Sequence, residues 1–214
     1  MSNSIERTRE ALLEEGVILC IRLDSAAGVV EGCRAALSGG LRVLELTLTT
    51  PGALDAMRLL SQDPTALVGA GTVLSADDVK AVANAGGRFV LSPVFDPEVI
   101  DTAHTLGLLA IPGTATPTEI LAAHRYGAKL VKVFPSGALG GPAYLRAVRG
   151  PLPDVPLIPT SGPTSENLHE YFAAGARAVG VGAEVITRGF TLGGVESAAA
   201  RVRAAVRKAR NSSH

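Results

Sequence analysis

Short apolar runs alternate with longer amphipathic segments along most of the chain. Eight such runs follow one another at intervals of about 20–25 residues, near the minimum for one βα unit. They are GVILCIRL (16–23), VLELTL (43–48), ALVGAG (66–71), FVLSP (89–93), LLAIPG (108–113), LVKVFP (130–135), LIPTSG (157–162) and AVGVGA (178–183). Runs that are apolar without alternation are typical of parallel strands buried on both faces.

The segments between the runs predict helices, because they are rich in alanine and carry apolar residues at helical spacing. Thr116 is placed to cap one of them, with Pro117 at the first position and Glu119 at the third. Ser75 gives a second start signal, and several segments end at glycine, such as Gly39. The pattern therefore repeats strand and helix in turn.

This repeat predicts an α/β fold, a (β/α)8 TIM barrel with an extra N-terminal helix. An open doubly wound sheet is the competing architecture, but eight near-equal units without a GxGxxG turn favour closure. Residues at about 1–15 predict the extra helix, expected to plug the bottom of the barrel. A basic helix is expected at about 191–209, followed by a frayed tail at about 210–214. We expect a single domain over residues 1–214.

Composition narrows the class of protein. Lysine plus arginine and aspartate plus glutamate each number 20, and aromatics are only 4%, which argues against a nucleic-acid surface. No apolar run reaches the roughly 18–20 residues that span a bilayer. Cys20 and Cys33 are expected to be reduced core thiols of a cytoplasmic protein. We expect no metal site, because no ligand spacing is formed by the histidines, His104, His124, His169 and His214.

Three strand-like runs contain a charge: Arg22, Glu45 and Lys132. A lone buried charge is costly, so each needs a partner or a use. One interpretation is a structural ion pair of Glu45 with Lys132 or Arg22. The other places all three at the mouth of the barrel, where active sites lie. Lys129 and Arg42 stand at the beginnings of their strands and are expected to be solvated.

The mouth interpretation points to imine chemistry. Burial and the nearby Arg22 favour the neutral amine of Lys132, which attacks a ketone. The protonated imine then accepts electrons when a C–C bond breaks, and Glu45 moves the protons, directly or through a water. Glycine-rich loops at 69–74, 159–167 and 180–185 indicate anion binding by backbone amides, with tight turns that bind nothing as the alternative.

The order of these motifs resembles the 2-keto-3-deoxy-6-phosphogluconate (KDPG) and 4-hydroxy-2-oxoglutarate (KHG) aldolases over about residues 5–205. The similar runs are LRVLELTLTTP (41–51), GAGTVL (69–74), FVLSP (89–93), IPGTATPTE (111–119), KLVKVFPSGALGG (129–141), GPLPDVPLIPTSG (150–162) and AVGVGAEV (178–185). The resemblance implies a homotrimer of barrels that needs no cofactor. It assigns the Schiff-base lysine to Lys132 of KVFP rather than Lys129, and the catalytic glutamate to Glu45.

The resemblance also implies the substrate contacts. Thr72 of GAGT holds the carboxylate, and Pro93 and Phe134 line the pocket. The distal end of the substrate faces residues 160–163 and 182–183, which include Thr160, Ser161, Gly162, Gly182 and Ala183. Family members often have arginine where this chain has Thr49, and Arg22 is expected to take over its role. A Thr-Gly-Gly loop is replaced by Thr-Ser-Gly, and a serine by Ala183, which weakens the expectation of tight phosphate binding.

The expected function is a class I aldolase that cleaves a 4-hydroxy-2-keto acid, such as KDPG or 4-hydroxy-2-oxoglutarate, to pyruvate and an aldehyde. The alternatives are a related pyruvate aldolase for an unphosphorylated or galactonate-type keto acid, or a sugar-phosphate isomerase or synthase in which Lys132 only contacts charge. A non-catalytic sugar-acid binding barrel would leave Glu45 and Lys132 as a structural pair. No nucleic acid or membrane partner is expected.

Overall fold

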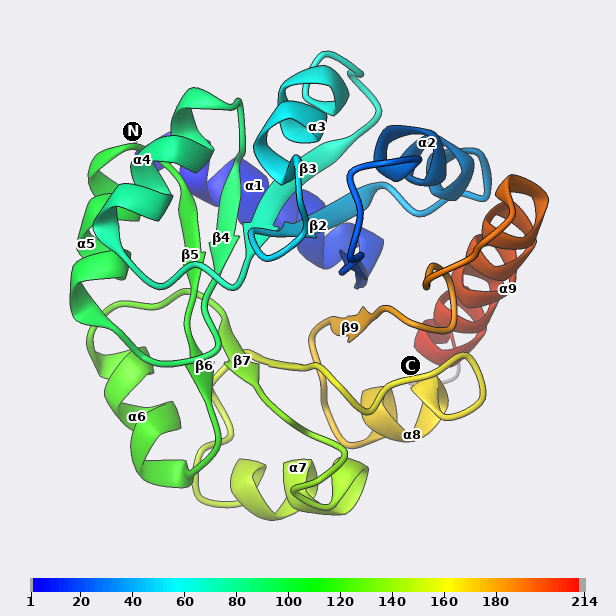
Figure 1. Cartoon of the computed structure of the whole chain (residues 1–214). Helices are drawn as coiled ribbons and strands as arrows, with labels where there is room; N and C mark the ends of the chain where they lie inside the picture. Colours follow the sequence, from blue (N-terminus) through cyan, green and yellow to red (C-terminus); the bar gives the residue numbers. More distant parts are fainter. Residues whose placement is uncertain (1, 212–214) are drawn as a thin grey trace.

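The computed structural model describes residues 2–211, in which parallel strands are surrounded by helices (Figure 1). The helices are α1 (Ser2–Glu15), α2 (Val29–Ser38), α3 (Ala53–Leu60), α4 (Ala76–Asn84), α5 (Pro97–Thr105), α6 (Pro117–Arg125), α7 (Gly141–Arg149), α8 (Leu168–Ala173) and α9 (Leu192–Asn211). The strands are β1 (Val17–Ile21), β2 (Val43–Thr47), β3 (Leu67–Gly71), β4 (Phe89–Leu91), β5 (Leu109–Ile111), β6 (Gly113–Thr114), β7 (Val131–Val133), β8 (Leu157–Pro159) and β9 (Val179–Val181). Each of the eight apolar runs therefore contains a strand.

The strands form two parallel sheets. A curled six-stranded sheet has the order β5-β4-β3-β2-β1-β9, and a three-stranded sheet has the order β6-β7-β8. An isolated parallel bridge joins Thr160, directly after β8, to Gly180 in the middle of β9. β5 and β6 are consecutive in the chain and are separated by Pro112, which has no N–H for a ladder. The predicted α/β fold with parallel strands is confirmed. The strand pairing forms two sheets, so it does not show the one continuous eight-stranded sheet of the predicted barrel.

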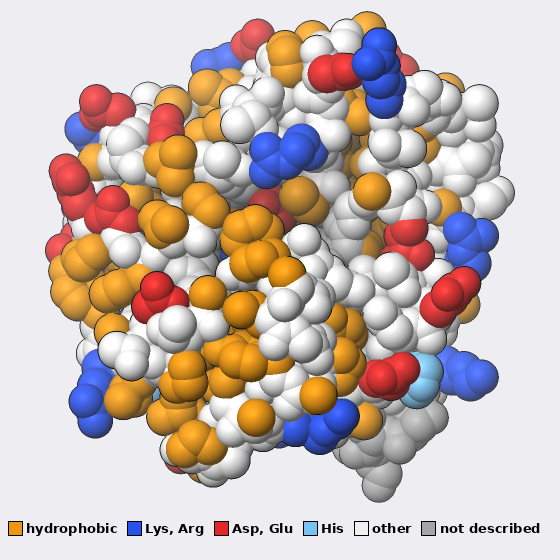
Figure 2. Space-filling view, turned by 60° about the horizontal axis from the view of Figure 1, so that its bottom comes forward, with side chains coloured by type: hydrophobic (Ala, Val, Ile, Leu, Met, Phe, Trp, Pro, Cys, Tyr) orange, Lys and Arg blue, Asp and Glu red, His pale blue; other side chains and the backbone are white. Residues whose placement is uncertain are grey.

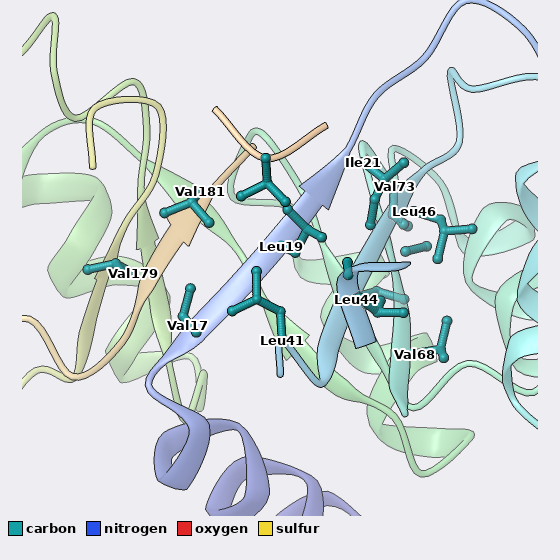
Figure 3. Packing of buried hydrophobic residues seen from close by; sticks show 14 of the residues in the cluster. Val17, Leu19, Ile21, Leu41, Leu44, Leu46, Val68, Val73, Val179 and Val181 are labelled. Carbon is teal, nitrogen blue, oxygen red and sulfur yellow. The ribbon is translucent and has the colours of Figure 1, made fainter. Parts of the chain in front are cut away.

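Two apolar clusters lie on opposite faces of the strands. Side chains of Val17, Leu19 and Ile21 belong to the cluster between the strands and the helices (Figure 3). The second cluster takes the alternate strand positions and is made of Leu12, Ile18, Val43, Phe89, Leu91, Leu109, Ile111, Leu130, Ile158 and Ala178. Because successive strand residues point to opposite faces, β1, β2, β4, β5 and β8 each contribute to both clusters.

The helix starts follow the predicted signals. Thr116 and Glu119 form a complete capping box at α6, and the Ser75 hydroxyl accepts from the Asp78 N–H at α4. Each cap supplies partners for N–H groups that the helix itself leaves free. Both predictions are confirmed.

The described part of the chain begins and ends with a helix. α1 contacts β1 and β5 and contributes Leu12 to the second cluster, which confirms the predicted N-terminal helix over the described residues. Figure 1 shows α1 crossing behind the strands. The predicted tail is wrong at residues 210 and 211, because α9 continues through Asn211. Residue 1 and the remaining tail, 212–214, lie outside the described residues.

No helix between residues 2 and 211 is both long and apolar enough to cross a bilayer.

Candidate active site

Strand alternation brings the unusual polar residues to one interior. Ile18, Val43 and Leu130 belong to the second cluster, so the residues two positions further along these strands point the same way. Those residues are Cys20, Glu45 and Lys132. Cys20 lies beside Glu45 in the parallel register of β1 and β2. The apolar interior thus ends in a polar layer.

A cavity of about 490 Å³ opens above this layer. It is lined by every predicted site residue except Thr49, namely Arg22, Glu45, Thr72, Pro93, Lys132, Phe134, Thr160, Ser161, Gly162, Gly182 and Ala183. The loops after β8 and β9 supply about half of this lining, and most of the rest comes from β1, β2, β7 and β9 and from residues that follow β1, β3 and β4. Residues that are far apart in the sequence therefore meet at one site. Their roles in binding and catalysis stay predictions.

Glu45 is the most buried acid of the cavity, with only 2% of the residue exposed. Burial raises the pKa of its carboxyl above the ordinary value, and the positive charges of Lys132 and Arg22 and a hydrogen bond with Cys20 only partly oppose that shift. A carboxyl with a raised pKa is suited to take up and release protons near neutral pH. Glu45 therefore has the properties of a general acid–base.

The Glu45 carboxylate occupies space that a side chain at residue 71 would fill. A Cβ added to Gly71 would collide with the Glu45 carboxylate and approach its Cγ to 2.9 Å. We expect Gly71→Ala to displace the carboxylate and to lower kcat by about tenfold or more, because a misplaced catalytic group loses orientation. Steady-state kinetics test this, with Gly193→Ala as the control, since no atom lies within 4 Å of a Cβ there. Unchanged kcat in Gly71→Ala would contradict this position for the carboxylate.

Lys132 is also buried, with 7% of the residue exposed, and its Nζ lies 5.0 Å from the centre of the Phe134 ring. The ion pairs found among the described residues include neither Lys132 nor Glu45. The interpretation of a close structural ion pair therefore finds no contact in its favour. Lys129 and Arg42 are exposed, as predicted.

Arg22 stands at the mouth and holds two threonines. Its Nη1 donates to the Thr49 hydroxyl and its Nη2 to the Thr72 hydroxyl, the latter over 2.8 Å. Thr72 has a φ of 59°, in the left-handed region, which costs energy for a β-branched residue. Such strain is often found where a side chain must be aimed at a ligand. Thr49 does not line the cavity and is connected to the site by its hydrogen bond with Arg22.

Several residues of the cavity were not predicted from the sequence, among them Cys20 and Glu184. Cys20 was expected in the core with Cys33, but it is only half-buried and lines the cavity, whereas Cys33 is buried. Burial and the neighbouring Glu45 raise the pKa of the Cys20 thiol. Glu184 lines the distal end beside Ala183. Its place in GVGAEV, three residues after the end of β9, does not distinguish it from an ordinary loop acid.

The histidines stay away from the site. His104 and His124 are half-buried on α5 and α6, His169 is exposed on α8, and none of them lines the cavity. Residues 2–211 contain no group of three or more histidine, cysteine, aspartate or glutamate residues placed to hold a metal ion. His214 lies outside the described part of the chain.

Known proteins are similar to this chain in both sequence and fold. A family model described as KDPG and KHG aldolase matches residues 8–196. A 2-dehydro-3-deoxy-phosphogluconate aldolase of Treponema pallidum is 40% identical over 167 residues, 77% of this chain and 79% of the relative. An enzyme of the same name from Pseudomonas aeruginosa is 38% identical over 161 residues, 75% of this chain and 73% of the relative.

Two solved structures extend these matches. A KDPG aldolase from Legionella pneumophila, with pyruvate captured as a covalent carbinolamine intermediate, superposes with a TM-score of 0.74. It is 29% identical and the match covers 91% of this chain and 95% of that one. A porous protein cage designed by fusing symmetric oligomeric domains superposes with a TM-score of 0.86 at 30% identity, over 92% of this chain and 74% of that one.

Proposed function

Because this chain is an aldolase that belongs to the KDPG and KHG aldolase family, we propose that it cleaves 4-hydroxy-2-keto acids by class I, Schiff-base chemistry. The observation that carries this proposal is the pairing of a buried lysine and a buried glutamate in one cavity without an ion pair between them. Lys132 is the nucleophile and Glu45 is the acid–base.

The reaction begins when Nζ of Lys132 attacks the C2 ketone to form a carbinolamine, which loses water and becomes a protonated imine. Glu45, directly or through a water, removes the proton of the C4 hydroxyl. The C3–C4 bond breaks, its electrons form the enamine, and an aldehyde leaves. The enamine carbon C3 is then protonated, and hydrolysis of the imine releases pyruvate and the free lysine.

The substrate carboxylate is oriented by the groups at the mouth. The hydroxyl of Thr72 and the guanidinium of Arg22 lie within one hydrogen bond of each other and offer donors to a carboxylate. Thr49 holds Arg22 on its other side. Pro93 and Phe134 line the same cavity and exclude water from the imine.

The distal half of the substrate faces Thr160, Ser161, Gly162, Gly182 and Ala183. With KDPG as substrate the second product is glyceraldehyde 3-phosphate, and with 4-hydroxy-2-oxoglutarate it is glyoxylate. A galactonate-type or unphosphorylated keto acid uses the same imine and differs only at this distal end. The reaction needs no metal or organic cofactor.

Reduction with borohydride in the presence of pyruvate tests the imine. We expect a stable carboxyethyl adduct on Lys132, identified by mass spectrometry of peptides, because borohydride reduces a protonated imine to a secondary amine. Lys129, three residues away and exposed, is the internal control. An unmodified protein, or an adduct on Lys129 alone, would refute the assignment.

The architecture proposed for this site is a single domain, a closed (β/α)8 barrel with α1 at its bottom. In it β5 and β6 together count as the fifth strand. The bridge between Thr160 and Gly180 supports contact between β8 and β9. The second apolar cluster, which draws on β1, β2, β4, β5, β8 and α1, supports an enclosed interior.

The chain is further proposed to act in the cytoplasm as a homotrimer. Its relatives are aldolases by name, and both cysteines are free thiols. Figure 2 shows hydrophobic side chains gathered over the side that carries α5, α6 and α7. On this side Val94 and Tyr126 are 51% and 43% exposed, and the Tyr126 ring lies 5.9 Å from that of Phe95. An apolar surface of this kind supports contact between subunits.

A further inference from the structure

A carboxylate occupies the distal end of the cavity. Both carboxylate oxygens of Glu184, after β9, accept from the Ser165 N–H at 3.0 Å, and one also accepts from the Ser165 hydroxyl at 2.9 Å. These three contacts bridge the loops after β8 and β9, the two loops that form the distal wall. Glu184 is half-buried, so its charge is only partly screened by solvent.

The cationic side chains of the cavity come from elements other than the two distal loops, one from the residue after β1 and one from β7. Among the described lining residues these are Arg22 and Lys132, which the proposed function uses for the carboxylate and the imine. The distal wall therefore contributes a negative charge and no positive side chain. A phosphate ester carries close to two negative charges at neutral pH, and like charges brought together are disfavoured.

The same wall also offers hydrogen-bond donors. The backbone N–H groups of Gly162 and Ala183 have no acceptor within the described residues. The hydroxyl of Thr160, a buried residue that lines the cavity, has no partner there either. Donors beside a carboxylate suit a hydroxyl group, which both accepts and donates, whereas a phosphate dianion only accepts.

We propose that Glu184 sets the specificity of the aldolase for an unphosphorylated substrate, a 2-keto-3-deoxy sugar acid whose distal end carries hydroxyl groups. This inference rests on the proposed function and adds the substrate class. The free N–H groups and the Thr160 hydroxyl donate hydrogen bonds to the distal hydroxyl oxygens, and the Glu184 carboxylate accepts a hydrogen bond from a distal hydroxyl. A phosphate on the same carbon faces the Glu184 carboxylate without a compensating cation.

The test compares two substrates that differ only in the phosphate, 2-keto-3-deoxygluconate and its 6-phosphate ester. The wild-type protein is expected to have the larger kcat/KM for the unphosphorylated acid. Glu184→Gln keeps the size of the side chain and an acceptor for Ser165 but removes the charge. We expect it to shift the ratio of the two kcat/KM values by about tenfold towards the ester.

Glu166→Gln is the matched control, because Glu166 adjoins Ser165 and is exposed but does not line the cavity. It should leave the ratio unchanged. Inorganic phosphate gives a readout independent of turnover: titration calorimetry should show tighter binding to Glu184→Gln than to the wild-type protein. A wild-type preference for the ester would overturn the inference, and so would a ratio and phosphate affinity that Glu184→Gln leaves unchanged.

Borohydride trapping separates this inference from the proposed function. If pyruvate is trapped on Lys132 while the ester is the better substrate, only the role of Glu184 fails. If pyruvate is not trapped at all, the class I mechanism fails and this inference with it.

Discussion

Lys132→Met is expected to lower kcat by on the order of 10⁴-fold or more, because the thioether cannot form an imine and removal of a covalent nucleophile costs this much in other enzymes. Methionine has a similar length and suits an apolar surrounding, so the fold should be retained. The rate of pyruvate release at saturating keto acid measures the effect. Lys129→Met, which changes an exposed lysine of the same segment, is the control and should keep its activity.

The same variant separates catalysis from structure through its stability. Lys132 is buried and belongs to none of the ion pairs of the described residues, so its burial opposes folding. We therefore expect Lys132→Met to raise the free energy of unfolding by about 1–3 kcal/mol, measured by urea denaturation. A fall of about 3 kcal/mol or more would identify Lys132 as a partner in a structural pair. Full catalytic activity of the Lys132→Met variant would rule out an imine at residue 132.

Glu45→Gln is expected to lower kcat by about 10²–10⁴-fold while pyruvate can still be trapped on Lys132. The amide keeps the shape of the side chain but cannot accept the proton of the substrate hydroxyl. Steady-state kinetics and borohydride trapping on the same preparation test both halves of this expectation. Loss of trapping together with turnover would show that the variant disturbs the imine itself. Unchanged turnover would remove Glu45 from the mechanism.

The pH dependence of the wild-type protein also tests the assignment of Glu45 as the base. As a base Glu45 acts in its deprotonated form, and burial raises its pKa above 4.5. The value of kcat/KM should therefore fall, as the pH is lowered, through a pKa above that of an ordinary carboxyl. In Glu45→Gln this acidic limb of the residual activity should be absent. Its persistence at the same pH would assign the limb to another group.

Much of the fold was predictable because the apolar runs are separate from one another and similar in length. Every predicted run contains a strand, and the Thr116 capping box follows from a local sequence rule. The break at Pro112 was not predicted, because the run LLAIPG is apolar throughout and only the missing N–H of proline divides it. The end of α9 was also misplaced, since the basic residues of a last turn do not by themselves fix the final residue.

The site was predictable where a charge interrupts an apolar run. Glu45 and Lys132 stand out in this way, whereas Cys20 is itself compatible with a core and reveals its position only through strand alternation. Glu184 lies in the loop after a strand, where an acidic residue is unremarkable. It contacts Ser165, which is 19 residues away in the sequence and belongs to another loop. Tertiary pairing of that kind leaves no local pattern in the sequence.

The helix α1, with Leu12 in the interior cluster, covers the strands at the end opposite the mouth. In the proposed closed barrel the cavity has one opening for both products. In the proposed reaction the pyruvate half is attached to Lys132 in the deepest layer, and the aldehyde half lies between it and solvent. We expect the aldehyde to depart first and pyruvate last, so that condensation in the reverse direction has a compulsory order with the keto acid binding before the aldehyde.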